Sequence, residues 1–306
     1  MKKPVIIYTL SSVLCLLLGK LEFQIVDQIE TIICIISIGL FGISHGAIDN
    51  HLSGSKGTYE NLRFIFRYLI AASLFGLFWY VNSNFAFVVF LIISGYHFGQ
   101  SQFIDYIKDV NLKNRLLFLS WGVWLLISYI FFNKSKLIQS GVPTSLDIDV
   151  FHLIIQYAYA GFLSSSTLIF IFLVYLWKSG LISMNQFFIE LFQAFIICAV
   201  FKSTSFLLGF TLYFIILHSY RVLEHEFYYL NRVRDSFSIK NFILLLLPFT
   251  LVSIAGLSLI IFLVSLLELN FSLTLISIIF ISCLTFPHSF VMDGFYQKFK
   301  ISPQNE

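Results

Sequence analysis

The 306-residue chain has the composition of a membrane protein: 58% of its residues are hydrophobic, only 11% are charged, and its mean hydropathy is +0.88. A soluble domain carries about 25% charged residues, so this composition excludes an ordinary soluble enzyme. The net charge of +3 gives no support for nucleic-acid binding, because membrane topology accounts for the basic residues.

Apolar runs long enough to cross a bilayer follow one another along the whole chain. They fall at about 4–20, 31–49, 62–81, 85–103, 114–132, 152–177, 186–201, 204–225, 241–267 and 271–290. The first and seventh are short, so eight or nine spans fit as well as ten. We therefore expect an all-α integral membrane protein with about 8–10 transmembrane helices, forming a single polytopic domain over residues 1–306.

The basic residues orient these helices. If the N-terminus is inside, 15 of the 19 Lys and Arg residues fall at cytoplasmic helix ends and 4 fall on the other side. Positive residues concentrate on the cytoplasmic side of membrane proteins. The sequence therefore predicts a multi-pass protein with both termini in the cytoplasm.

One stretch combines polar and small residues at the end of an apolar run. In Gly39-Leu-Phe-Gly-Ile-Ser-His-Gly-Ala-Ile-Asp49, His45 and Asp49 are four residues apart. On a continuous helix, that spacing places both side chains on one face. Ionisable residues inside a membrane segment are costly, so they mark a candidate functional site.

Three other runs carry a histidine near their inner ends, namely His97, His218 and His288. Like the run with His45, each is expected to run from outside to inside. The four histidines are therefore predicted to form a layer near the cytoplasmic side, within about 5–10 Å of the membrane boundary at about 1.5 Å of rise per residue. His51 and His152 are interpreted as solvated residues at a loop and a helix start.

Such a layer has the chemistry of a metal site. Neutral imidazoles bind Fe, Zn or Cu, and each ring needs a polar partner to orient it. Candidate partners at the same depth are Asp49, Gln100, Glu190, Glu224 and Asp293. A single membrane histidine is more often a helix–helix hydrogen bond, but four in one layer favour a shared site. Arg221 is expected to extend to the membrane interface, with ring orientation at the site as the other option.

These residues resemble the motifs of a known family, the bacterial Brp/Blh-type β-carotene 15,15′-dioxygenases. The resemblance rests on His45-Gly-Ala-Ile-Asp49, Tyr96-His97-Phe-Gly99, His218-Ser-Tyr-Arg221 and Pro287-His288, in that order. It implies a non-haem Fe(II) enzyme of the bacterial inner membrane. Its partners would be a carotenoid substrate, O₂ and membrane lipid, with cleavage of the central double bond of β-carotene giving retinal. By motif position, His45, His97 and His218 carry over as catalytic metal ligands.

The sequence departs from the family pattern at two positions, and the first concerns a metal ligand. The family has a second histidine one turn after the first in H-S-x-R-H, and this chain has Val222 there. His288 is the better candidate for a fourth ligand, because it arrives on another helix. His225 is weaker, because it lies seven residues from His218 and about 10 Å along the axis. Gln100 replaces the usual acidic residue.

Three functions therefore remain open. The first is the Fe(II)-dependent carotenoid dioxygenase, and the second is a carotenoid- or retinoid-binding membrane protein of the same fold without catalysis. The third is a membrane transporter, against which the sequence shows no inverted repeat. For the enzyme, a cytoplasmic layer of histidines requires a tilted or interface-parallel substrate tunnel. We expect aromatic residues and Gly42, Gly46, Gly95 and Gly99 to border it.

Overall fold

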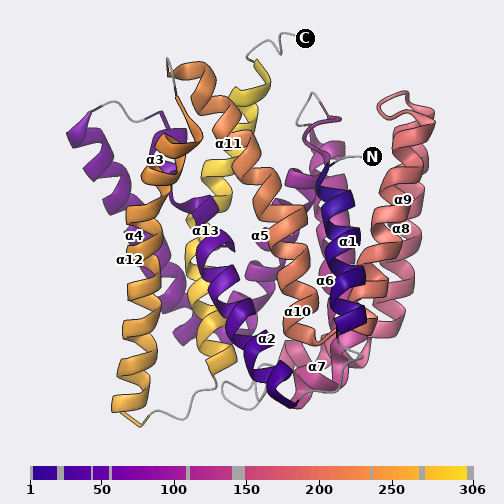
Figure 1. Ribbon diagram of the computed structural model, residues 1–306, viewed down its shortest axis with the longest axis horizontal. Helices are drawn as coiled ribbons and strands as arrows, with labels where there is room; N and C mark the ends of the chain where they lie inside the picture. Colours follow the sequence, from indigo (N-terminus) through magenta and orange to yellow (C-terminus); the bar gives the residue numbers. More distant parts are fainter. Residues whose placement is uncertain are drawn as a thin grey trace.

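The computed structural model describes residues 3–18, 24–42, 44–54, 57–107, 111–139, 149–234, 237–268 and 273–301. Within these ranges the chain is helical and contains no strand. The helices form a bundle, and most of them run between the upper and lower ends in Figure 1. The all-α expectation is confirmed.

Each predicted apolar run contains a helix. The helices are α1 (Lys3–Leu18), α2 (Gln24–Ser37), α3 (Asp49–Leu52), α4 (Thr58–Val81), α5 (Ser83–Phe103), α6 (Leu112–Gln139), α7 (Asp149–Gln156), α8 (Ala158–Lys178), α9 (Met184–Ser203), α10 (Phe206–Leu212), α11 (Tyr220–Val233), α12 (Ile239–Leu266) and α13 (Leu273–Ile301). A π-helical segment, Ile38–Gly42, follows α2, and another, Tyr213–Ser219, joins α10 to α11.

Among the described residues, seven helices are long and apolar enough to cross a membrane, against about 8–10 expected. They are α4, α6, α8, α9, the continuous stretch from α10 to α11, α12 and α13. The N-terminal runs give two shorter apolar helices, Pro4–Cys15 and Ile32–Phe41. Helix α5 is not among the seven, because its second half is rich in buried polar residues such as His97 and Gln100. The chain is a multi-pass membrane protein.

Several boundaries differ from the predicted runs. The run at 31–49 is not one helix, because α2 gives way to the π-helical segment and then to a short 3₁₀ turn at Ser44–Gly46. The run at 152–177 is divided at Tyr157 into α7 and α8. The last helix continues through Pro287 and extends to Ile301.

These extensions correct the position of two histidines. His218 lies near the middle of the stretch Phe206–Val233, and His288 lies near the middle of Leu275–Lys298. Neither stands at the end of its helix, where the sequence placed it. Apolar runs identify the segment that suits lipid, but a polar, amphipathic continuation such as α11 stays helical beyond it.

The tightest helix pairing in the bundle joins α5 to α6. A Cβ atom on Gly99 would lie 1.8 Å from the carbonyl oxygen of Phe118, and one on Gly122 would lie 1.8 Å from that of Gly95. Small residues let two membrane helices approach to backbone contact in this way. This pairing fixes α5, the helix that carries His97.

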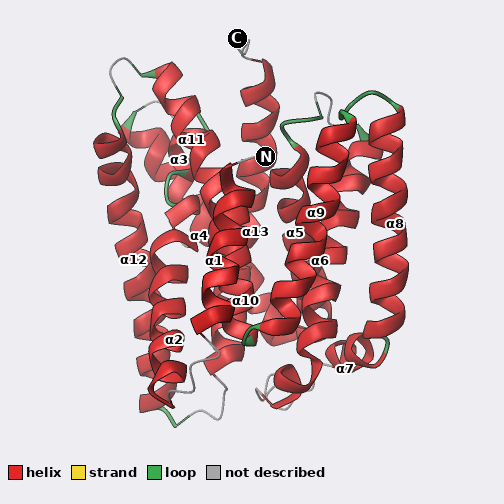
Figure 2. Ribbon diagram, turned by 45° about the vertical axis from the view of Figure 1, so that its right-hand side comes forward, coloured by secondary structure: helices red, strands yellow, loops and turns green. Residues whose placement is uncertain are grey.

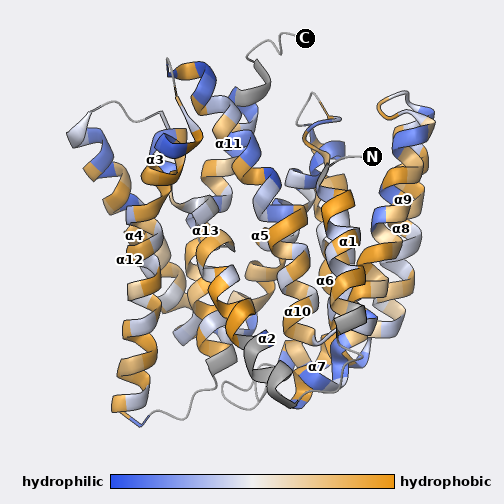
Figure 3. Cartoon of the chain, in the orientation of Figure 1, coloured by the Kyte–Doolittle hydropathy of each residue, from blue (hydrophilic) through white to orange (hydrophobic). Residues whose placement is uncertain are grey.

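Hydrophobic surface covers the middle of the bundle, and polar residues gather at its ends. Figure 3 shows the hydrophobic colouring along α12 and α10, and the hydrophilic colouring at α3, upper α11 and α7. The start of α1 and the end of α13 both lie toward the upper end, as Figure 2 also shows. The described chain therefore begins and ends toward the same end of the bundle.

Candidate metal centre

Three of the four motif histidines come together inside the bundle. His97 lies on α5, His218 in the π-helical segment before α11, and His288 on α13, and all three are buried. The ring centroid of His97 is 4.7 Å from that of His218 and 4.9 Å from that of His288. Both ring pairs meet edge to face at 84°. Histidines 70 to 191 residues apart in sequence thus meet at one place.

Ser101 fixes the orientation and tautomer of His218. Its hydroxyl donates to the carbonyl oxygen of Phe98 at 2.9 Å, and its Oγ lies 3.0 Å from His218 Nδ1. Because its hydrogen is already used, Ser101 accepts from His218, whose Nδ1 therefore carries the hydrogen. The lone pair of the neutral ring is then on Nε2. The rings of Phe98 and Phe214 pack against His218 at 4.7 and 5.4 Å.

Asp49 fixes the orientation and tautomer of His288. Both carboxylate oxygens of Asp49 lie 3.0 Å from His288 Nδ1, and both residues are buried. A carboxylate can only accept, so Nδ1 donates and Nε2 again carries the lone pair. Burial raises the pKa of Asp49, and the neighbouring His288 and Tyr68 oppose that rise. Gly46 packs on the same ring, since a Cβ there would lie 3.3 Å from His288 Nδ1.

His45 lies four residues before Asp49 in the chain, but its side chain lies outside the described part of the structure. It sits in the 3₁₀ turn Ser44–Gly46, and Asp49 begins α3 just after it. The expectation that His45 and Asp49 share one face of a continuous helix is therefore wrong. The break in the helix instead carries Asp49 to His288, on α13.

Glu190 supports α5 through a chain of polar contacts. Glu190 accepts from Gln102 Nε2 at 2.5 Å and from the Tyr106 hydroxyl at 2.7 Å. Arg221 Nη1 donates to Gln102 Oε1 at 2.6 Å and to the carbonyl oxygen of Ser101 at 3.4 Å. Arg221 is thus buried, and the expectation that it extends to the membrane interface is wrong. It holds the backbone beside Ser101, the partner of His218.

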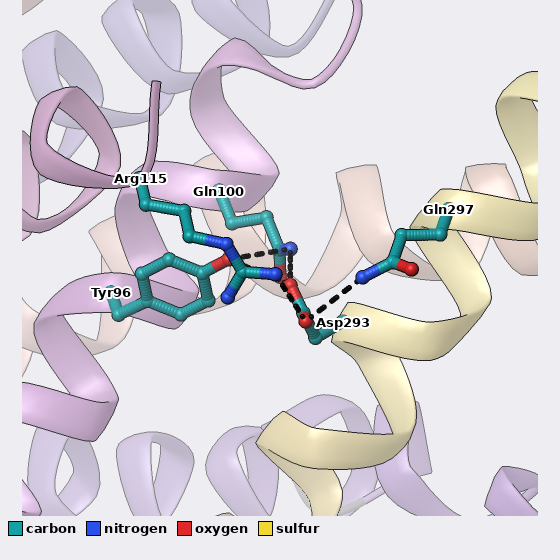
Figure 4. Close-up of polar contacts among 5 residues, drawn as sticks. All are labelled: Tyr96, Gln100, Arg115, Asp293 and Gln297. Carbon is teal, nitrogen blue, oxygen red and sulfur yellow. Dashed lines mark hydrogen bonds and ion pairs between the residues drawn. The ribbon is translucent and has the colours of Figure 1, made fainter. Parts of the chain in front are cut away.

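Gln100 and Asp293 belong to a second polar cluster, which is separate from the histidine rings (Figure 4). Gln100 Nε2 and the Tyr96 hydroxyl donate to Asp293 Oδ1 at 2.9 and 2.6 Å. Arg115 and Gln297 donate to Asp293 Oδ2 at 3.1 Å each. This cluster joins α5, α6 and α13. It sets the positions of His97 and His288 through their helices, and its described contacts do not include an imidazole.

His225 lies with other partners. Its Nε2 is 3.0 Å from Asp105 Oδ1, and its Nδ1 is 3.3 Å from the Tyr296 hydroxyl. Val222, where the resembling family has a histidine, is fully buried. With these partners, His225 links α11 to α13, and it is not part of the cluster of His97, His218 and His288.

Sequence reasoning missed three residues near the centre. Ser101 lies one turn after His97 on α5, a spacing that would have found it. Tyr68 lies beside Asp49, and its hydroxyl donates to the carbonyl oxygen of Leu284 at 3.2 Å. Glu226 is fully buried, and neither carboxylate oxygen has a hydrogen-bond partner among the described residues. The positions of Tyr68 and Glu226 in the sequence give no indication of a role at the centre, because only the packing of distant helices brings these residues close to it.

The described donors have the chemistry that a metal ion needs. Imidazoles bound to one ion at about 2.1 Å have ring centroids about 5 Å apart, close to the separations here. Two of the rings hold their hydrogen on Nδ1 toward an oxygen, which is the usual arrangement of metal-bound histidine. No group of three or more described His, Cys, Asp or Glu side chains is arranged to hold an ion.

Three of the four glycines expected to border a tunnel are closed by packing instead. Gly95 and Gly99 are closed against α6, and Gly46 packs on His288. Gly42 has no described surroundings. Gly46, Gly95 and Gly99 therefore serve close packing.

Comparison with known proteins gives one match. A family model described as Beta-carotene 15,15'-dioxygenase matches residues 36–296, which include all four motif histidines. No curated protein and no solved structure matches the chain significantly.

Proposed function

Because the chain belongs to the β-carotene 15,15′-dioxygenase family, we propose that it cleaves β-carotene or a related carotenoid at the central double bond with O₂. The observation that supports this most directly is the meeting of His97, His218 and His288 inside a membrane bundle. The overall reaction breaks one carbon–carbon double bond and gives each carbon one oxygen atom. Two retinal molecules result, and no added reductant is needed.

In this proposal His45, His97, His218 and His288 hold an Fe(II) ion. Histidine-bound Fe(II) with open coordination positions is the type of centre that activates O₂ in non-haem oxygenases. Asp49 and Ser101 hold two of the rings with Nε2 available as donor. The buried rings of Phe98 and Phe214 keep water from His218. The chain's own contribution is thus to orient the ligands in a dry, apolar place.

The membrane is part of the proposed mechanism, because both the carotenoid and retinal dissolve in lipid. We propose the bacterial inner membrane, with both termini in the cytoplasm, as the location. The positive-inside bias supports this orientation, and the start of α1 and the end of α13 lie toward the same end of the bundle.

Retinal formation by the purified, Fe(II)-loaded protein tests the proposal. We expect wild type to form retinal. We expect His45→Ala, His97→Ala and His218→Ala to lower retinal formation by more than about 100-fold. Loss of a metal ligand should lower activity more than loss of a residue that only hydrogen-bonds a ligand, which costs about 10- to 100-fold. Bound iron, measured by elemental analysis, should fall with activity. His152→Ala is the control, since His152 is exposed on α7. Unchanged turnover in the three ligand variants would refute the assignment.

A second function is favoured by Val222, which stands where the resembling family has a histidine. The chain would then bind a carotenoid or retinoid without cleaving it. Val222→His separates the two functions. Retinal from wild type shows that valine is tolerated. Retinal only from Val222→His shows a family member with a lost iron site, and carotenoid binding without O₂ uptake by either protein favours the binding function.

A further inference from the structure

Glu226 on α11 is a buried carboxylate without a partner. Its side chain is 0% exposed, and neither of its oxygens has a hydrogen-bond partner among the described residues. It lies four residues after Val222, which is also fully buried, so this face of α11 points into the bundle. An ionised carboxylate in such a place is costly unless a positive charge balances it. The interior beside Glu226 therefore suits a cation.

Two acidic neighbours lie beside Glu226. Asp49 is close enough for the charges of the two carboxyl groups to interact, and the Tyr296 hydroxyl is also within this range. Neither side chain brings a positive charge. Asp49 in turn holds Nδ1 of His288 at 3.0 Å. Glu226 is thus next to a residue that orients a ring of the candidate metal centre.

The buried charges of the described chain do not balance by themselves. Among the described residues, the buried Asp, Glu, Lys and Arg side chains are Asp49, Glu190, Arg221 and Glu226. Glu190 and Arg221 offset each other through Gln102, to which both are hydrogen-bonded. Asp49 and Glu226 remain, and they carry two negative charges when both are ionised. A divalent ion held by neutral imidazoles brings two positive charges, which balance them.

We propose that Asp49 and Glu226 are the two counter-charges of the metal centre, and that Glu226 strengthens the binding of a divalent ion without being one of its ligands. The inference rests on the proposed function, because it concerns the Fe(II) ion of that same site. Asp49 acts through its hydrogen bond to His288. Glu226 acts through its charge, because charges interact strongly across an interior of low dielectric constant.

A titration of the metal-free protein with Fe(II) tests the charge of Glu226. Glu226→Gln removes the charge and keeps the shape, so it should weaken Fe(II) binding by at least about tenfold. Glu226→Asp keeps the charge and should stay within about threefold of wild type. Glu224→Gln is the matched control, because Glu224 is partly exposed on the same helix and points about 200° away from Glu226. It should bind Fe(II) as wild type does.

The thermal unfolding midpoint of the metal-free protein separates charge from packing. Without an ion, the unpaired carboxylate of Glu226 costs stability, so Glu226→Gln should unfold at the same temperature as wild type or higher. A lower midpoint together with weaker iron binding would make Glu226 a packing residue and would overturn the inference. Equal Fe(II) affinity in wild type and Glu226→Gln, or an equal loss in Glu226→Gln and Glu226→Asp, would also overturn it.

Retinal formation, measured beside the Fe(II) affinity, distinguishes this inference from the proposed function. If wild type binds Fe(II) more tightly than Glu226→Gln but forms no retinal, the counter-charge stands and the catalytic proposal fails. If wild type forms retinal and Glu226→Gln binds Fe(II) equally tightly, the function stands and the counter-charge fails. If wild type binds no Fe(II), both fail.

Discussion

Ser101 and Asp49 show how one hydrogen bond sets the chemistry of an imidazole. Each holds a histidine Nδ1 at 3.0 Å and leaves Nε2 as the donor atom. The sequence indicated Asp49 by its place in a motif, but for the wrong geometric reason. Its described histidine partner is His288, which is 239 residues away. Spacing along a chain finds neighbours on one helix and says nothing of a contact made across helices.

Ser101→Ala should weaken iron binding about 10- to 100-fold while the protein stays folded, because the oxygen that orients His218 is lost. The iron affinity is measured by titration of the apoprotein. Ser120→Ala is the control, since the Ser120 hydroxyl donates to the carbonyl oxygen of Leu116 in its own helix. Equal iron affinity in wild type and Ser101→Ala would show that His218 needs no such anchor.

At the scale of helices, apolar runs predicted where each helix lies but not where it is interrupted. The π-helical segments at Ile38–Gly42 and Tyr213–Ser219 have ordinary apolar sequences, so hydropathy does not reveal them. The burial of Arg221 was equally hidden, because its partner Gln102 comes from α5. Both features depend on contacts between helices far apart in sequence.

The contact of α5 with α6 gives a prediction at this scale. Gly122→Ala should lower the thermal unfolding midpoint strongly, because its Cβ would lie 1.8 Å from the carbonyl oxygen of Gly95 and would force the helices apart. Gly256→Ala is the matched control, since nothing lies within 4 Å of a Cβ there. The midpoints are compared in one detergent. If the two variants had the same midpoint, the close contact would not contribute to stability.

For the whole molecule, composition and charge were the most informative features of the chain. They predicted an all-α membrane bundle, and the motifs predicted that His97, His218 and His288 lie together. They could not predict how deep the histidines lie within their helices, because α11 and α13 continue past the apolar runs. They also could not show that the glycines close a helix contact.

The orientation of the whole bundle is testable at the two ends of α9. Ser179, just before this helix, and Lys202, near its end, are both exposed. We expect Ser179→Cys to react with an impermeant maleimide only from the cytoplasmic side, and Lys202→Cys only from the outside. The experiment uses intact cells and inverted vesicles. The reverse pattern would invert the topology and place both chain ends outside.

The π-helical segment at His218 also constrains how the length of this region can change. A π-turn holds one residue more than an α-helical turn, and each residue of a helix turns the chain by about 100°. Deleting one residue between Tyr213 and Ser219 would let the segment close into α-helical turns, which hold one residue fewer, and would leave α11 facing as it does. Arg221 and His225 would keep their contacts with Gln102 and Asp105, whereas the side chains inside the segment, His218 among them, would shift against their partners. The extra residue of the π-turn therefore serves the placement of His218 and not that of the helix beyond it.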